Sequence, residues 1–168
     1  MSRSATLNAV IQNQLKIADI ESAEEVGAVL TLTRTATQAI TTAGTTIVWQ
    51  SEIRGYQIEW SGSDITIPAT GWYMVSVATL LSVAQNDLLY RIIVNGTSVQ
   101  VVPGFGDVNR SASSAVFMRH FIEDDVLAIN LIPSANANLN VVAENGAAES
   151  PILNIVQLSG EVDVDEDV

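Results

Sequence analysis

The stretch that decides the fold is ITIPATGWYMVSVATLL, residues 65–81. Pro68 fixes φ and has no N–H to donate to a ladder, so it ends a short strand, and Gly71 gives a tight turn its backbone freedom. The aromatic and β-branched residues after Gly71 predict the longest strand of the chain. Both faces of this strand are largely apolar: Trp72, Met74, Ser76, Ala78 and Leu80 on one, Tyr73, Val75, Val77, Thr79 and Leu81 on the other.

A strand that is apolar on both faces needs a cover on each side. Such strands usually belong to parallel sheets under helices, but no helical pattern flanks this one. The segments 115–122 and 152–158 have the same two-sided character. Apolar faces of this size that stay exposed to water cost free energy and promote aggregation. We therefore expect another copy of the chain to cover the second face.

The rest of the chain predicts further short strands separated by Gly, Pro, Ser and Asn. Asn95-Gly96 between two apolar runs predicts a hairpin with a type I′ turn. The expected strands number roughly ten, with no internal helix, which indicates an all-β sandwich or barrel. Apart from segment 72–81, they are residues 29–35, 45–49, 56–60, 64–67, 88–94, 98–102, 115–122, 126–132 and 152–158, with weak strand character at 139–143.

Composition excludes several classes of function. The chain has 168 residues, which suits one domain, and a net charge of −12. Such a charge argues against binding to nucleic acid or to an anionic membrane. Cysteine is absent, so neither a disulfide framework nor a thiolate metal site is expected. No signal peptide and no apolar run of membrane-spanning length is recognisable.

The two ends differ from the middle in composition. Residues 1–27 read as an arm with apolar residues at helical spacing, and we expect it to dock on a partner through Leu7, Val10, Ile11 and Leu15. A frayed leader is the alternative. Residues 28–160 form the predicted body. Residues 161–168 hold five carboxylates and predict a solvated acidic tail.

The body resembles the C1q/TNF-like jelly-roll family between Val29 and Gly160. The resemblance is carried in order by Tyr56 ahead of ITIPATGWY, Val94-Asn95-Gly96, Glu123-Asp124-Asp125-Val126-Leu127, and the last strand with its Ser159-Gly160. Glu123 departs from the glycine usual in the third motif, and the last strand lacks an aromatic residue. The resemblance implies a ten-stranded jelly-roll sandwich that assembles as a homotrimer, with one sheet against the threefold axis. The interface candidates are Met74, Val116, Phe117, Met118, His120 and Ile155.

Residues that carry chemistry are few. His120, the single histidine, lacks the neighbouring motif that a catalytic base needs, so we expect a structural role. Glu123 to Asp125 favours a charged hairpin tip over a calcium site, because the spacing of a calcium loop is absent. Trp49, Trp60 and Trp72 favour packing over sugar stacking. We expect no catalytic residue, no cofactor and no metal.

The sequence therefore favours a non-enzymatic virion protein, a phage capsid decoration (cement) or head-fibre protein. Its expected partners are itself and the major capsid protein or another virion protein, and its expected location is the virion, assembled in the host cytoplasm. The alternative is a receptor- or glycan-binding knob of a tail fibre or of a bacterial surface trimer. Both rest partly on analogy, because a fold does not fix a function.

Overall fold

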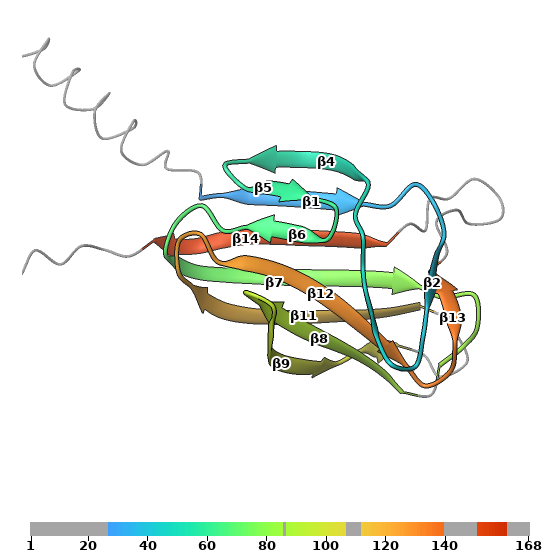
Figure 1. The fold of residues 1–168 in the computed structure, drawn as a ribbon. Helices are drawn as coiled ribbons and strands as arrows, with labels where there is room; N and C mark the ends of the chain where they lie inside the picture. The colour runs from blue at the N-terminus through green and yellow to red at the C-terminus, as the bar shows by residue number, and fades with distance from the viewer. Residues whose placement is uncertain (1–26, 86, 107–111, 140–150, 161–168) are drawn as a thin grey trace, which may run out of the picture.

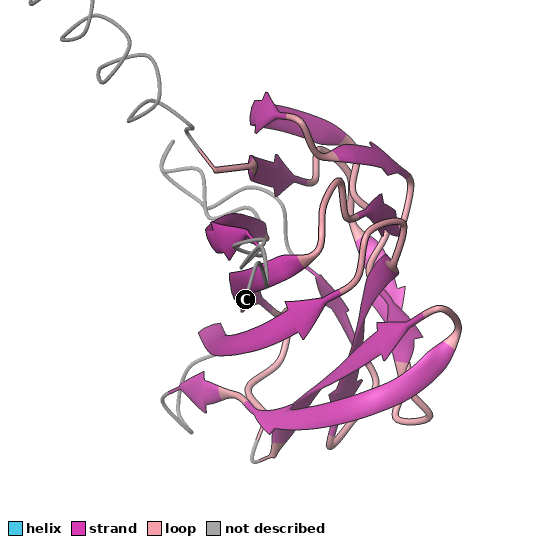
Figure 2. Ribbon diagram, turned by 90° about the vertical axis from the view of Figure 1, so that its left-hand side faces the viewer, coloured by secondary structure: helices cyan, strands magenta, loops and turns pink. Residues whose placement is uncertain are grey.

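The computed structural model describes residues 27–85, 87–106, 112–139 and 151–160, which fold into a two-layered sandwich of antiparallel strands (Figures 1 and 2). The predicted all-β class is confirmed. Within these residues there is no helix that is long and apolar enough to cross a membrane. The predicted boundaries of the arm and the tail stay predictions, since residues 1–26 and 161–168 lie outside the described part.

The first layer, called the β7 sheet here, has six strands, of which β7 is the stretch that follows Gly71. Its spatial order is β10 (Phe105–Gly106), β11 (Ala112–Phe121), β7 (Gly71–Leu80), β14 (Ile152–Gly160), β1 (Val29–Thr33) and β4 (Ser51–Tyr56). β7 lies near the middle and pairs over its whole length with β11 and from Gly71 to Ala78 with β14. Its central position explains why its sequence is largely apolar.

The second layer, called the β12 sheet, covers one face of the β7 sheet (Figure 1). Its order is β5 (Glu59–Ser61), β6 (Asp64–Thr66), β12 (Val126–Pro133), β8 (Leu88–Val94) and β9 (Thr97–Pro103), and β3 (Thr45–Thr46) also pairs with β12. A separate pair joins β13 (Ala137–Leu139) to β2 (Gln38–Ile40). The predicted hairpin is confirmed, because Asn95 and Gly96 both have positive φ between β8 and β9.

The core lies between the layers and takes alternate residues from each strand. Tyr73, Val75 and Val77 of β7 point inward and are almost fully buried. Tyr73 meets Phe121 of β11 edge-on, with the ring centroids 5.8 Å apart. The pleat sends the intervening residues of β7 and β11 to the outer face of the β7 sheet. One face of each two-sided apolar strand is therefore covered by the chain itself.

Some predicted strand boundaries were wrong. Residues 56–60 do not form one strand, because Gln57, at φ 65°, separates β4 in the β7 sheet from β5 in the β12 sheet. β4 itself was missed, since the polar Ser51–Tyr56 has no apolar alternation. Short elements such as β2 and β13 raise the number of strands in the described residues above the roughly ten predicted.

The two ends of the sandwich differ, and one of them, called the arm end, holds both ends of the described chain (Figure 1). β1 begins at this end, and Gly160 of β14 pairs there with Gly71 at the start of β7. The Ala28 N–H donates to Gln157 Oε1 at 3.1 Å. The turns 67–70, 95–96 and 122–125 also lie here, linked to one another by hydrogen bonds.

Amide side chains fix the loops at the other end, called the distal end. Gln38 Nε2 donates to the Thr46 carbonyl at 2.7 Å, and its Oε1 accepts from the Val48 N–H at 3.0 Å. The buried Gln85 Oε1 accepts from the Ala135 N–H at 2.9 Å. These bonds satisfy loop backbone groups that secondary structure leaves unpaired.

Candidate functional site

The outer face of the β7 sheet, which the β12 sheet does not cover, exposes a row of large apolar side chains. Strand register places five apolar or aromatic side chains in one row across it, in the order Met118, Met74, Val156, Val29 and Tyr56. Met118 is 63% exposed, Tyr56 is 51% exposed and Met74 is 36% exposed. Large exposed apolar patches on a soluble protein mark interaction surfaces.

The next row is polar in its middle, but its polar groups satisfy one another. It runs Val116, Ser76, Asn154, Thr31 and Arg54. The Thr31 hydroxyl donates to Asn154 Oδ1 at 3.0 Å, and Asn154 Nδ2 donates to Ser76 Oγ at 3.3 Å. A partner can therefore cover these three side chains, called the polar ladder here, without leaving their bonded groups unpaired.

Trp72 and His120 form a third pair on the same face, next to the arm end. They are cross-strand neighbours, and their rings meet edge-on with centroids 5.6 Å apart. Trp72 is half-exposed. An exposed indole packed on an imidazole extends the apolar surface and gives a partner a large, rigid contact.

Charge is distributed unevenly between the sheets. The six strands of the β7 sheet contain a single carboxylate, Glu52, although the whole chain has a net charge of −12. Glu52 is engaged at the sheet edge, where its Oε2 accepts from Trp60 Nε1 of β5 at 3.0 Å. The face rows hold no carboxylate, so two copies can approach through them without repulsion between carboxylates.

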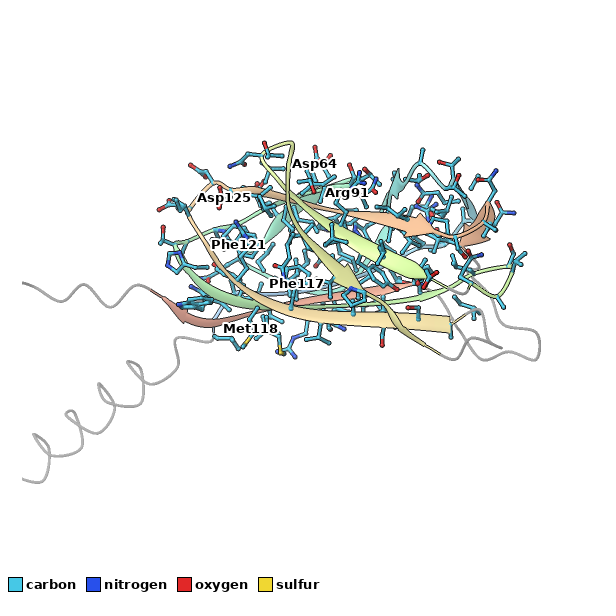
Figure 3. All side chains as sticks on the ribbon, turned by 90° about the horizontal axis from the view of Figure 1, so that it is seen from below. Asp64, Arg91, Phe117, Met118, Phe121 and Asp125 are labelled. Carbon is cyan, nitrogen blue, oxygen red and sulfur yellow. The ribbon has the colours of Figure 1, made fainter. Side chains whose placement is uncertain are left out.

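The structure divides the predicted interface residues into two groups. Met74, Val116, Met118 and His120 lie on the outer face. Phe117 and Ile155 were assigned wrongly to that face: each pairs with Val75 in an inward-facing row, where they are 5% and 0% exposed. Figure 3 shows Met118 outside the sheet and Phe117 between the layers. The chain's own β12 sheet covers Phe117 and Ile155.

Sequence reasoning missed part of the face. Val29, Val156 and Tyr56 complete the apolar row, but they come from strands distant in sequence, and only the register reveals their alignment. The predicted docking residues Leu7, Val10, Ile11 and Leu15 lie outside the described residues. No group of three or more potential metal ligands occurs in the part of the chain that the structure describes.

The carboxylate run 123–125 closes a turn. The Asp125 Oδ1 accepts from Asn95 Nδ2 at 2.7 Å, and its Oδ2 accepts from the Ile122 N–H at 2.9 Å. Glu123 and Asp124 are exposed. The tryptophans do not form one platform, because Trp49 is in the core and Trp72 is on the outer face.

Comparison with known proteins identifies the fold. By sequence, the chain matches no family model and no curated protein. By structure, it is similar to murine APRIL, with a TM-score of 0.58 and 17% identity over 78% of this chain and 98% of that one. The fold is the TNF-like jelly roll.

Two further solved structures extend the similarity. The PRD1 vertex protein P5 has a TM-score of 0.58 and 16% identity, covering 80% of this chain and 99% of that one. The Eiger TNF of S. frugiperda has a TM-score of 0.53 and 10% identity, covering 85% and 98%. The jelly-roll resemblance predicted from the sequence is confirmed. The same fold serves proteins of different kinds, so the function must be argued from the surface.

Proposed function

We propose that this protein is a non-enzymatic virion structural protein, a homotrimer that decorates a capsid or forms a head fibre and docks through its N-terminal arm. Its partners are two further copies of itself and the major capsid protein or another virion protein. No cofactor is needed, because the proposed work is binding. The similarity of the fold to the PRD1 vertex protein P5 supports a virion location.

The observation that carries the proposal is the outer face of the β7 sheet. It combines an apolar row with a self-satisfied polar ladder and lacks carboxylates. Burial of apolar surface stabilises an assembly by ~25 cal/mol per Å². A closed cyclic oligomer covers the face of every copy at once, whereas an open chain of copies leaves one face wet. The number three is what the jelly-roll resemblance implies.

The positions of the chain ends support docking through the arm. The body's first described residue, Gly27, and its last, Gly160, both lie at the arm end (Figure 1). Three arms from one trimer therefore start on the same side. Linked binding segments gain avidity, because after the first has bound, the others bind at a high effective concentration. The distal end then points away from the shell.

Light scattering on the purified protein tests the trimer. We expect three chain masses for the wild type and one for the variant Met74→Lys/Met118→Lys, because ammonium groups on this face are costly to bury. Val101→Lys, a half-exposed position on β9, is the matched control and should stay trimeric. A monomeric wild type at all concentrations would contradict the proposal.

Sedimentation with purified capsids that lack the protein tests the docking. A variant with Leu7, Val10, Ile11 and Leu15 changed to Ser should remain a folded trimer and fail to sediment with the capsids. If this variant binds capsids as well as the wild type does, the arm is not the anchor. If neither protein binds, the alternative function, a receptor- or glycan-binding knob, is favoured.

A further inference from the structure

Asn95-Gly96 forms the exposed turn between β8 and β9 at the arm end. Asn95 has φ 51° and Gly96 has φ 76°, as a type I′ turn requires. No atom would meet a Cβ on Gly96 within 4 Å, so the turn stands open to solvent. An asparagine followed by glycine is chemically the most vulnerable of the asparagine dipeptides, because glycine has no side chain to hinder attack by its own nitrogen.

Both ends of the Asn95 carboxamide are held by the neighbouring turn. Oδ1 accepts from the Val126 N–H at 2.9 Å, and Nδ2 donates to Asp125 Oδ1 at 2.7 Å. The Val126 N–H is unambiguously a donor, which fixes the orientation of the amide. The Asn95 N–H also donates to the Val126 carbonyl at 2.9 Å. Asp125 is held in turn by the Ile122 N–H at 2.9 Å.

We propose that Asn95 is a latent deamidation site that the Asp125 carboxylate keeps in an unreactive geometry. In the reaction, the Gly96 backbone nitrogen loses its proton and attacks the Asn95 carboxamide carbon. Ammonia leaves with the proton returned, and a five-membered succinimide forms. Water then opens the ring to aspartate or to isoaspartate, so that the net change is one water consumed and one ammonia released. No oxidant, reductant or cofactor takes part.

The clamp opposes the first step because attack requires the carboxamide to rotate toward the Gly96 nitrogen. That rotation breaks the bonds to Asp125 and to Val126 together, and a hydrogen bond to a charged group is among the stronger ones. The product of deamidation would also weaken the contact between the two turns. A carboxylate at position 95 would face Asp125 at hydrogen-bond distance, and two like charges so close repel. The hairpin would then lose the bond from Asn95 Nδ2 to Asp125 that helps to tie it to the β11–β12 turn.

Peptide mass spectrometry during incubation at neutral pH measures the reaction, by the mass gain when an amide becomes an acid. Three proteins are compared: the wild type, Asp125→Ala and Thr70→Ala. Thr70→Ala is the matched control, because Thr70 Oγ accepts from the Glu123 N–H at 3.0 Å in the same turn and does not touch Asn95. Asn145-Gly146, the chain's other Asn-Gly pair, lies outside the described residues and serves as the reference in each sample.

We expect the deamidation rate at Asn95, relative to that at Asn145, to rise roughly tenfold in Asp125→Ala, which corresponds to ~1.4 kcal/mol of clamping. Thr70→Ala should leave the ratio unchanged. Equal ratios in all three proteins would overturn the proposal, and so would an equal rise in both variants, because that would indicate general loosening.

A second measurement needs no variant. In urea the wild-type clamp is absent, so the Asn95 rate should exceed its rate in the folded protein by at least the same factor. A folded protein that deamidates at Asn95 as fast as in urea would overturn the proposal, even if Asp125→Ala does not fold.

Discussion

At the scale of single residues, Tyr90 carries a hydroxyl into the space between the two sheets. Its side chain is fully buried, and its hydroxyl lies 2.7 Å from Thr79 Oγ and donates to the Ser113 carbonyl at 3.1 Å. Burial raises the pKa of Tyr90 above the ordinary 10.0, and the two hydrogen bonds lower it by less. The hydroxyl is therefore a satisfied polar group in an apolar core.

Tyr90→Phe should lower the free energy of unfolding at neutral pH by about 1–3 kcal/mol, because Thr79 and the Ser113 carbonyl lose their partner. Alkaline pH gives a second readout. The unfolded chain ionises near pH 10.0 while the folded phenol keeps its proton, so the contribution of Tyr90 to stability is constant below that pH and falls above it. The fall should be shallower in Tyr90→Phe, in which Tyr73, whose pKa burial also raises, still contributes. Identical alkaline slopes would contradict the argument.

Arg34 is a second buried polar residue, but a poorly satisfied one. It is 5% exposed, and its Nε and Nη2 both donate to the Ala36 carbonyl, at 3.1 and 3.0 Å. In the described part of the chain its Nη1 has no acceptor, and burial lowers the pKa of the guanidinium. A buried charge with one neutral partner contributes little to stability.

Arg34→Met should therefore leave the free energy of unfolding unchanged or raise it by about 1 kcal/mol, since methionine fills a similar volume without the cost of desolvation. Urea unfolding measures the change. Arg34→Ala, the control, should destabilise because it leaves a cavity. A loss above ~2 kcal/mol in Arg34→Met would indicate that Nη1 has an acceptor.

At the scale of elements, β11 contributes one face to the core and the other to the exposed outer surface. Phe117 and Phe121 point into the core, whereas Val116 and Met118 point outward (Figure 3). The period-two pattern predicted the alternation but not which face the chain covers itself, because both faces are apolar. The assignment of Phe117 and Ile155 to the outer surface failed for this reason.

Phe117→Ala should destabilise the fold by about 3–5 kcal/mol, the usual cost of removing a buried phenyl ring. Ser114→Ala on the exposed face of the same strand is the control and should change stability by less than about 0.5 kcal/mol. Chemical denaturation with a single spectroscopic probe measures both. A Phe117→Ala protein as stable as the control would return Phe117 to the list of interface candidates.

Turn chemistry was the most readable element-level signal. Pro68-Ala69-Thr70-Gly71 and Asn95-Gly96 both mark connections that the structure contains. β4 was not readable, because an edge strand with exposed Glu52 to Tyr56 lacks the alternation that burial imposes. β4 forms because it pairs with the neighbouring β1, and this pairing joins segments that are not adjacent in the sequence.

At the scale of the whole molecule, the order and spacing of four short motifs predicted the jelly roll, because together they match the connections of that fold although each alone is weak. The outer surface was less predictable. Its apolar row comes from five strands, β11, β7, β14, β1 and β4, and alignment across a sheet depends on register, which a one-residue shift would invert.

Net charge acts on the whole assembly. In the proposed trimer, three copies at −12 each would repel one another at long range, while the carboxylate-free faces would attract at contact. Raising the ionic strength from about 0.01 M to about 0.15 M shortens the Debye length from roughly 30 Å to roughly 8 Å. Salt should therefore raise both the proportion of trimer and the melting temperature.

Removal of residues 161–168 gives the matched control for this salt effect. It deletes five carboxylates and changes the formal charge from −12 to −7, so the melting temperature should depend less on salt. Scanning fluorimetry over a sodium chloride series measures both proteins. A melting temperature that falls as salt rises would show that attractive ion pairs outweigh the repulsion.

The described chain begins and ends at the arm end, which has a practical consequence for use of the protein as a scaffold. If the arm docks as proposed, a reporter or antigen fused at residue 27 or residue 160 would be placed between the body and the surface to which the arm binds. A peptide meant to be displayed outward belongs instead in a tight distal-end turn, such as Thr42–Ala43 between β2 and β3, both of them exposed. Surface turns of this kind tolerate insertion best. The proposed trimer would then present three peptides together.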